Sequence, residues 1–187
     1  MESRITALDQ ALEIILPEQK PALEWIRGRA VAKVSPRLRH AVLQGMFFNA
    51  LHAWSTGRHI VGTEWRFRLA PPGEIRRPLV PDVAVISRDA VRNLADRDFD
   101  SPPFGPLIVV EILSPGDPPS HIAHKREVYF ACGTSLMLVV DPFGRTVDAF
   151  EPAGTFKRFL QDDTLTAEAF PDMRIALRPL FAAIDFD

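Results

Sequence analysis

The chain has 187 residues, of which 47% are hydrophobic and 25% charged, and its net charge is −2. This length and composition predict one globular domain, residues 1–187, that buries a sizeable core. The small net charge excludes a surface that attracts polyanions everywhere, so a nucleic-acid partner would need a local basic patch.

The sequence shows no sign of export or membrane insertion. No apolar run reaches the roughly 20 residues that cross a bilayer, and the amino terminus has mixed charge instead of a signal-peptide pattern. The single cysteine, Cys132, excludes an internal disulfide and a zinc site built from cysteines. We therefore expect a cytoplasmic protein with no membrane partner.

The first third of the chain predicts a helix and then a β-hairpin. Residues 5–16 place apolar side chains at helical spacing. Residues 22–34 alternate around Arg27-Gly28-Arg29, which predicts a hairpin that turns near Gly28, with Glu24 in its first strand.

A second, longer helix is predicted after the hairpin. Ser35 suits the N-cap, Pro36 suits the first helical position, and Gly57 is a typical C-terminal stop. His40 lies off the centre of the apolar stripe of this helix, one turn before Gln44. We expect His40 to be a surface or half-buried residue and not a phosphate contact.

Two extended segments follow, residues 59–69 and 79–87, separated by the breaker Pro71-Pro72-Gly73. This arrangement predicts an antiparallel pair of strands. A short helical turn is expected at residues 89–94.

Residues 107–115 predict a buried central strand, because a short run rich in aliphatic residues lies between breakers on both sides. A helix with Ser120 as its N-cap should follow and end at Gly133, before a third buried strand at 136–141. A helix between two such strands implies a right-handed crossover and parallel neighbours. A hairpin over 147–160 and a closing helix at 179–184 complete the expected fold.

Asp82 and Glu111 interrupt two of these apolar strands. A buried carboxylate is costly unless another group compensates its charge. The two acids could share one divalent ion, share one proton, or form separate ion pairs with arginines. These residues alone leave the three alternatives open.

Lys125 is the third candidate, on the predicted helix that follows the Glu111 strand. It lies about 7.5 Å along that helix from Ser120, so it can lean over the end of the strand. Two carboxylates and a lysine suit Mg²⁺, which prefers hard oxygen ligands, with Mn²⁺ as a substitute. Such an ion activates water and neutralises phosphate charge, and a lysine beside it can orient the water or stabilise the transition state. Taken alone, Lys125 would be an ordinary solvated lysine.

Several short motifs occur in order along the chain. They are Glu24-Trp25-Ile26-Arg27-Gly28, Ser35-Pro36 with His40, Pro81-Asp82, Val110-Glu111-Ile112-Leu113-Ser114-Pro115, Lys125 with Tyr129, and Val139-Val140-Asp141-Pro142. This order resembles the Uma-two family of restriction endonucleases, within the PD-(D/E)XK nuclease superfamily, over about residues 22–185. The plain superfamily pattern has a lysine two positions after the second acid. That position is Leu113 here, and the resemblance places the lysine at Lys125 instead.

The resemblance implies an α/β (α+β) fold with a mixed central sheet flanked by helices, preceded by the N-terminal helix and hairpin. It also implies a magnesium-dependent DNA endonuclease in which Asp82 and Glu111 bind the metal and Lys125 is the catalytic lysine. Glu24 would be an auxiliary acid, Tyr129 would pack without reacting, and a homodimer is expected.

Two other functions remain open at this point. One is a catalytically silent nucleic-acid-binding or homodimeric assembly protein on the same scaffold, which the modest net charge favours. Its possible phosphate contacts are Arg37, Arg39, Arg66, Arg68, Arg76 and Arg77. A two-carboxylate sugar hydrolase is the more remote alternative, because the chain lacks the pattern of an aromatic-rich cleft.

Overall fold

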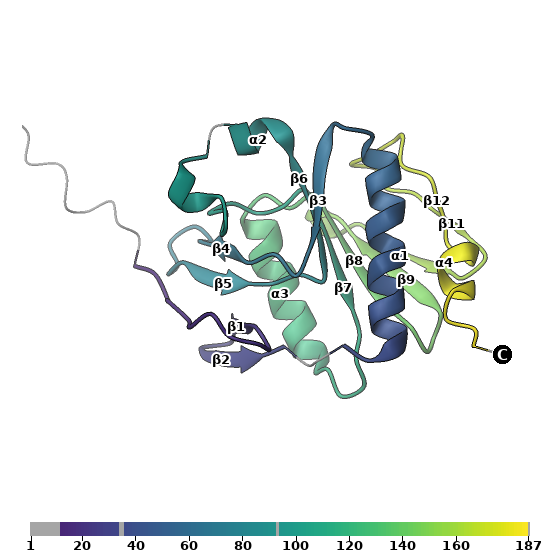
Figure 1. Cartoon of the computed structure of the whole chain (residues 1–187), viewed down its shortest axis with the longest axis horizontal. Coiled ribbons are helices and arrows are strands. Elements are labelled where there is room, and N and C mark those ends of the chain that lie inside the picture. Colours follow the sequence, from purple (N-terminus) through teal and green to yellow (C-terminus); the bar gives the residue numbers. More distant parts are fainter. Residues whose placement is uncertain (1–11, 34–35, 93, 187) are drawn as a thin grey trace, which may run out of the picture.

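The computed structural model describes residues 12–33, 36–92 and 94–186, and a six-stranded sheet forms its centre (Figure 1). In their spatial order the strands are β10 (Phe156–Leu160), β9 (Thr146–Phe150), β8 (Leu136–Asp141), β7 (Ile108–Ile112), β6 (Val83–Ser87) and β3 (His59–Thr63). Strands β7 and β8 are parallel, and all other neighbours are antiparallel.

Helices and small two-stranded sheets surround this sheet. The helices are α1 (Leu38–Ser55), α2 (Arg88–Arg92), α3 (Pro119–Ala131) and α4 (Arg178–Ala182). The small sheets pair β1 (Leu23–Ile26) with β2 (Arg29–Ala32), β4 (Phe67–Leu69) with β5 (Arg77–Leu79), and β11 (Thr164–Leu165) with β12 (Ile175–Ala176). Single 3₁₀ turns occur at Asp96–Asp98 and Pro152–Gly154.

The sheet is buried on both faces (Figure 1). Phe47 of α1 packs in one core cluster with Val110 of β7, whereas Tyr129 of α3 packs in a second cluster with Val109. Burial of each such side chain stabilises the fold by roughly 1.5–3 kcal/mol. A strand that is buried on both faces is apolar throughout, which explains the continuous apolar run around Glu111.

The alternation of side chains along β6 and β7 places both acids on the α3 face. Ala84 and Val109 belong to the core cluster on that face. Asp82 precedes Ala84 by two residues and Glu111 follows Val109 by two, so both point the same way. The Asp82 backbone N–H donates to the Val110 carbonyl at 3.1 Å, which holds the two acids on neighbouring chain segments.

The predicted mixed sheet flanked by helices is confirmed. Helix α3 connects the parallel strands β7 and β8, as the crossover argument required. The predicted first hairpin is β1–β2, whose turn at Arg27 and Gly28 has φ of 50° and 79°. None of the helices in the described part of the chain combines the length and apolar character that a bilayer crossing requires.

The predicted helix at residues 5–16 is wrong where it can be compared. Residues 5–11 lie outside the described residues, and 12–16 form no helix. The Arg76 backbone instead donates to the Leu12 carbonyl and accepts from the Ile14 N–H, both at 2.9 Å. Residues 12–16 therefore make backbone hydrogen bonds to the distant Arg76 instead of hydrogen bonds within a helix, because tertiary contacts override the helical pattern of this segment.

Both long helices begin at different residues from those predicted. Ser35 lies outside the described residues, and α1 begins at Leu38 with Arg37 at its N-cap. Helix α3 begins at Pro119, so Ser120 lies inside it and makes no cap. A proline at the first position suits a helix start because it brings no N–H that needs a partner.

The two long strands predicted at 59–69 and 79–87 are each interrupted. Glu64 adopts a left-handed conformation with φ of 50°, which ends β3 and lets β4 leave the main sheet. Pro81 lies between β5 and β6, where it has no N–H for a strand ladder. Asp82 therefore lies just before a strand instead of inside one.

Candidate active site

Glu111 is the penultimate residue of β7, a strand with every residue buried. Its Oε2 accepts a hydrogen bond from Lys125 Nζ at 2.7 Å, and its Oε1 accepts one from the Tyr129 hydroxyl at 3.0 Å. Burial raises the pKa of Glu111 to about 7, because it outweighs the opposing effect of Lys125 and is reinforced by the carboxylates of Asp82 and Glu24. Near neutral pH the carboxyl therefore exists in both protonation states.

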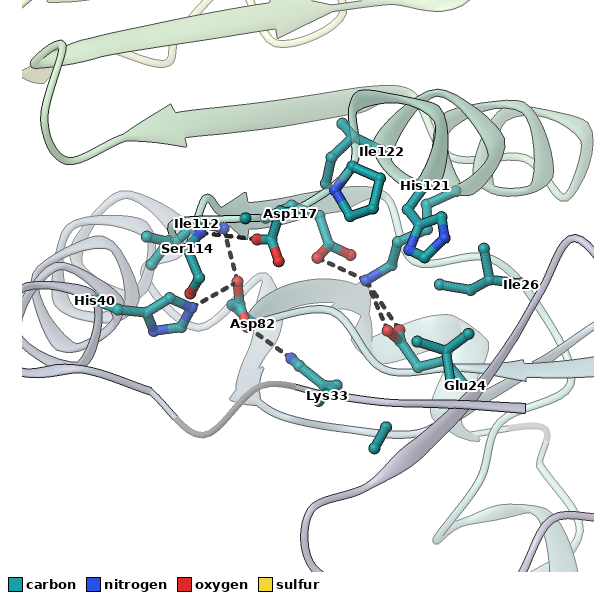
Figure 2. Close-up of a pocket in the computed structure, with 16 residues that line it drawn as sticks. Glu24, Ile26, Lys33, His40, Asp82, Ile112, Ser114, Asp117, His121 and Ile122 are labelled. Atoms are coloured by element: carbon teal, nitrogen blue, oxygen red, sulfur yellow. Dashed lines mark hydrogen bonds and ion pairs between the residues drawn. The ribbon is translucent and has the colours of Figure 1, made fainter. Parts of the chain in front are cut away.

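Asp82 is ionised through a different set of partners. Its Oδ1 accepts from Lys33 Nζ at 2.6 Å, and its Oδ2 accepts from the Ile112 backbone N–H at 2.6 Å. His40 Nε2 lies 3.3 Å from the same Oδ2 (Figure 2). Burial alone would raise the pKa of Asp82, but Lys33 and His40 hold it well below its ordinary value.

Lys125 lies between two acids. Its Nζ is 2.7 Å from Glu111 Oε2 and 2.9 Å from Glu24 Oε1, and its side chain is only 5% exposed. Burial would lower the pKa of Lys125, but Glu111 and Glu24 raise it above its ordinary value. The group is therefore an ammonium at neutral pH, suited to stabilising negative charge and unsuited to accepting a proton.

Glu24 reaches the same cavity from the small β1–β2 hairpin. It accepts the Val80 backbone N–H at 2.8 Å through Oε1 and is buried despite its charge. The structure thus brings together in one cavity all four residues singled out in the sequence, which are Glu24, Asp82, Glu111 and Lys125. Figure 2 labels Glu24 and Asp82 among the residues that line this cavity. Their roles in catalysis remain a proposal.

Tyr129 does more than pack. The one-turn spacing on α3 places Lys125 and Tyr129 on the same side of the helix, and both donate to Glu111. Burial and the neighbouring Glu111 raise the pKa of Tyr129 well above its ordinary value, so its hydroxyl keeps the proton that it donates.

Two residues of the site were not predicted from the sequence. His40 was expected in a different position, and Lys33 was not singled out. His40 was expected at the surface or half-buried, yet it is only 7% exposed and lies against Asp82. Gln44, four residues after His40, donates to the Asp82 carbonyl at 3.0 Å. Two polar residues one turn apart, away from the apolar stripe of the helix, were therefore the sequence pattern that could have placed His40 at the site. Lys33 gave no signal, because one lysine at the end of a hairpin has many ordinary explanations.

The alternative of separate ion pairs with arginines does not describe this site. Lysines, not arginines, pair with Asp82 and Glu111 among the described residues. Two of the buried or half-buried arginines have other partners: Arg68 pairs with Glu13 and Arg77 with Glu74.

The donor set fits a hard divalent ion bound by few protein ligands. Asp82 and Glu111 offer carboxylate oxygens to one cavity of about 170 Å³, which has room for several waters. Within the described ranges, no group of three or more His, Cys, Asp or Glu side chains is arranged to hold a metal. Two carboxylates completed by water and substrate suit Mg²⁺, which keeps part of its hydration shell, better than zinc, which prefers a fuller set of protein ligands.

The fold and the buried acid–lysine cluster define a class of protein, the nuclease-like α/β proteins with a mixed central sheet. The family model described as "Putative restriction endonuclease", Uma2, matches residues 8–178. Since this match covers most of the chain, the protein belongs to the Uma2 family.

A solved structure supports the same fold. It is described as a "putative nuclease belonging to DUF820" from Anabaena variabilis ATCC 29413 and matches with a TM-score of 0.77 at 21% sequence identity. The match covers 90% of this chain and 94% of the other. No curated protein matches the sequence.

Proposed function

We propose that this protein is a metal-dependent endonuclease that hydrolyses phosphodiester bonds of DNA, with water as the nucleophile. The observation that supports this most is the convergence of Asp82, Glu111 and Lys125 in one buried cavity. Membership of the Uma2 family supports the general class of nuclease.

In this proposal Asp82 and Glu111 hold Mg²⁺, or Mn²⁺ in its place. The ion would supply a lowered pKa for a water and charge neutralisation at a phosphate oxygen. Lys125, fixed by Glu24 and charged at neutral pH, stabilises the negative charge that develops on the phosphoryl oxygens. The water oxygen would form a bond to phosphorus while one P–O ester bond breaks, and the departing sugar oxygen would leave as a hydroxyl with a proton taken up from solvent, the water's own proton being released to solvent.

Two residues hold Asp82 in place for this role. The Ile112 N–H and the His40 ring both lie against Oδ2, which leaves Oδ1 directed toward Lys33. The auxiliary acid Glu24 accepts hydrogen bonds from the Lys125 ammonium and from the Val80 backbone N–H. Glu24 is therefore a positioning residue in this mechanism.

The test is cleavage of supercoiled, linear and single-stranded DNA by purified protein with Mg²⁺, with Mn²⁺ or with a chelator. We expect cleavage with metal only, and a loss of about 100-fold or more in Asp82→Asn and in Lys125→Met, as for removal of a preorganised charge. Asp162→Asn is the matched control, since this acid pairs with Arg178 at the surface. Absence of cleavage by folded protein on every DNA and with both metals would refute the proposal.

A second candidate is a catalytically silent DNA-binding protein. One observation favours it: Lys33 already pairs with Asp82 and Lys125 with Glu111, so both proposed metal ligands have a cationic partner without any metal. DNA binding that persists with chelator and in Asp82→Asn, without cleavage, would select this candidate. We keep the homodimer as part of either proposal, and light scattering in solution tests it.

A further inference from the structure

Lys33 brings a second ammonium into the cavity, opposite Lys125. It follows β2, and its backbone N–H donates to the Ala22 carbonyl at 2.9 Å. Its Nζ lies 2.6 Å from Asp82 Oδ1 and 3.0 Å from the Val80 carbonyl, with the side chain only 12% exposed (Figure 2). This cation is therefore held directly on one of the carboxylates proposed to bind metal.

The two oxygens of Asp82 have different neighbours. Oδ2 accepts the Ile112 N–H and lies against His40. Oδ1 has Lys33 as its partner, and so it is the oxygen best placed for another cation. Mg²⁺ binds oxygen at about 2.0–2.1 Å, so an ion on Oδ1 would lie very close to the ammonium of Lys33 and repel it.

We propose that Lys33 is an exchangeable cation: it neutralises Asp82 in the metal-free protein, and a divalent ion displaces it toward the cavity mouth, where it contacts the phosphate group of the substrate. This inference rests on the proposed function, because it assumes that Asp82 and Glu111 bind the ion. Lys33 is the exchangeable lysine because it contacts one carboxylate and one carbonyl, whereas Lys125 is held by Glu24 and Glu111 together. Its flexible stem lets the ammonium move while the hairpin stays in place.

Amine labelling of the unmodified protein tests this exchange without any substitution. The sequence has four lysines: Lys20 and Lys157 are exposed, Lys33 is half-buried, and Lys125 is buried. The labelled lysines are identified by mass spectrometry at low reagent concentration, with and without Ca²⁺ as a metal that favours binding over cleavage. We expect the metal to raise labelling of Lys33 several-fold while Lys125 stays protected and the exposed lysines label equally. If metal binds and Lys33 stays protected, the proposal is overturned.

Metal affinity gives a second readout, independent of activity. Titration with Mn²⁺ followed by electron paramagnetic resonance compares the wild type with Lys33→Gln and with the surface control Lys157→Gln. If Lys33 occupies Asp82 for more than nine-tenths of the time, its removal tightens binding by about tenfold or more. The control should bind as the wild type does. Equal or weaker binding by folded Lys33→Gln would also overturn the proposal.

The two experiments separate this inference from the proposed function. Loss of a positive charge strengthens metal binding even if Lys33 never moves, so labelling of the wild type is the decisive measurement, and it does not depend on the folding of the variant. Metal binding without exposure of Lys33 leaves the proposed metal site intact and refutes the exchange. Absence of metal binding in both wild type and Lys33→Gln refutes both.

Discussion

Lys125 Nζ and Glu111 Oε2 lie 2.7 Å apart in the interior, from residues fourteen positions apart in the chain. Strand β7 supplies the carboxylate and the crossover helix α3 supplies the ammonium, so the β7–α3–β8 crossover itself brings the two groups together. The next turn of α3 adds the Tyr129 hydroxyl, which donates to the other oxygen of Glu111. The connection between two parallel strands thus builds half of the site.

The first prediction concerns the energetics of this pair. Lys125→Met should lower the free energy of unfolding by about 3–5 kcal/mol, because it leaves Glu111 buried without its cation. Lys125→Met combined with Glu111→Gln should cost less than the sum of the two single changes, by about 0.5–3 kcal/mol. Urea denaturation at pH 8 measures all three. Additive effects would show that the two groups are not coupled.

The second prediction is a pH dependence caused by Glu111. The ordinary pKa of its carboxyl is 4.5 and its folded value is about 7. Between these values the folded state binds more protons, so the free energy of unfolding of the metal-free protein falls as pH rises, by up to about 1.4 kcal/mol per unit. Above pH 7 this contribution is flat. In the Glu111→Gln variant, the free energy of unfolding measured by urea denaturation should no longer show this fall between pH 4.5 and 7.

Other groups titrate near that window, so the comparison must be between wild type and variant. Burial lowers the pKa values of His59 and His124, which makes stability rise with pH up to their ordinary value near 6.5, in both proteins. Lys33 keeps the pKa of Asp82 below its ordinary value of 3.8. The ionised Asp82 therefore contributes its full stabilisation above pH 3.8, and this contribution is lost only as pH falls further. Identical pH dependence of wild type and Glu111→Gln would contradict the prediction.

The parts of the site that the sequence predicts are those with local signals. An acid that interrupts an apolar strand is visible in the sequence, and strand alternation then places Asp82 and Glu111 on one face. The helical spacing of Lys125 and Tyr129 is also a local pattern. The predicted central sheet follows from the same apolar runs and their breakers.

The parts that the sequence does not predict depend on distant backbone partners. Residues 12–16 have a helical pattern, but the Arg76 backbone pairs with them as an extended segment. Lys33 reaches Asp82 only because the β1–β2 hairpin lies over the cavity, and no local pattern encodes that position. Specific tertiary contacts decided both cases.

The third prediction compares two glycines. A Cβ on Gly105 would lie 2.5 Å from the Cys132 backbone carbonyl oxygen, beside the segment that leads into β7. Gly105→Ala should therefore lower the free energy of unfolding by about 1–3 kcal/mol, the cost of overpacking. Gly45→Ala is the matched control: its Cβ meets no atom within 4 Å, and alanine in the interior of α1 should stabilise by about 0.8–1 kcal/mol. Thermal denaturation measures both, and a neutral Gly105→Ala would be inconsistent with the tight approach.

The fourth prediction concerns two arginines in a groove beside the active-site cavity. Arg37 and Arg39 line an apolar groove that shares His40 and Ser114 with the active-site cavity. None of the described residues that line this groove is acidic, and the Arg39 guanidinium lies 5.4 Å from the Phe143 ring centroid. We therefore expect a phosphate backbone that enters the cavity by way of this groove to pass both arginines.

Replacement of both arginines by glutamine should weaken DNA binding and reduce its salt dependence. If each contacts one phosphate, the slope of log affinity against log salt should fall by about 2, because about 0.9 counterions are released per phosphate neutralised on duplex DNA. Fluorescence anisotropy in Ca²⁺ between 50 and 200 mM salt, roughly the range in which such losses are large, measures this. The matched control replaces Arg97 and Arg174, exposed arginines outside the groove, by glutamine and should keep the wild-type slope. An unchanged slope in the Arg37/Arg39 variant would place the DNA path elsewhere on the surface.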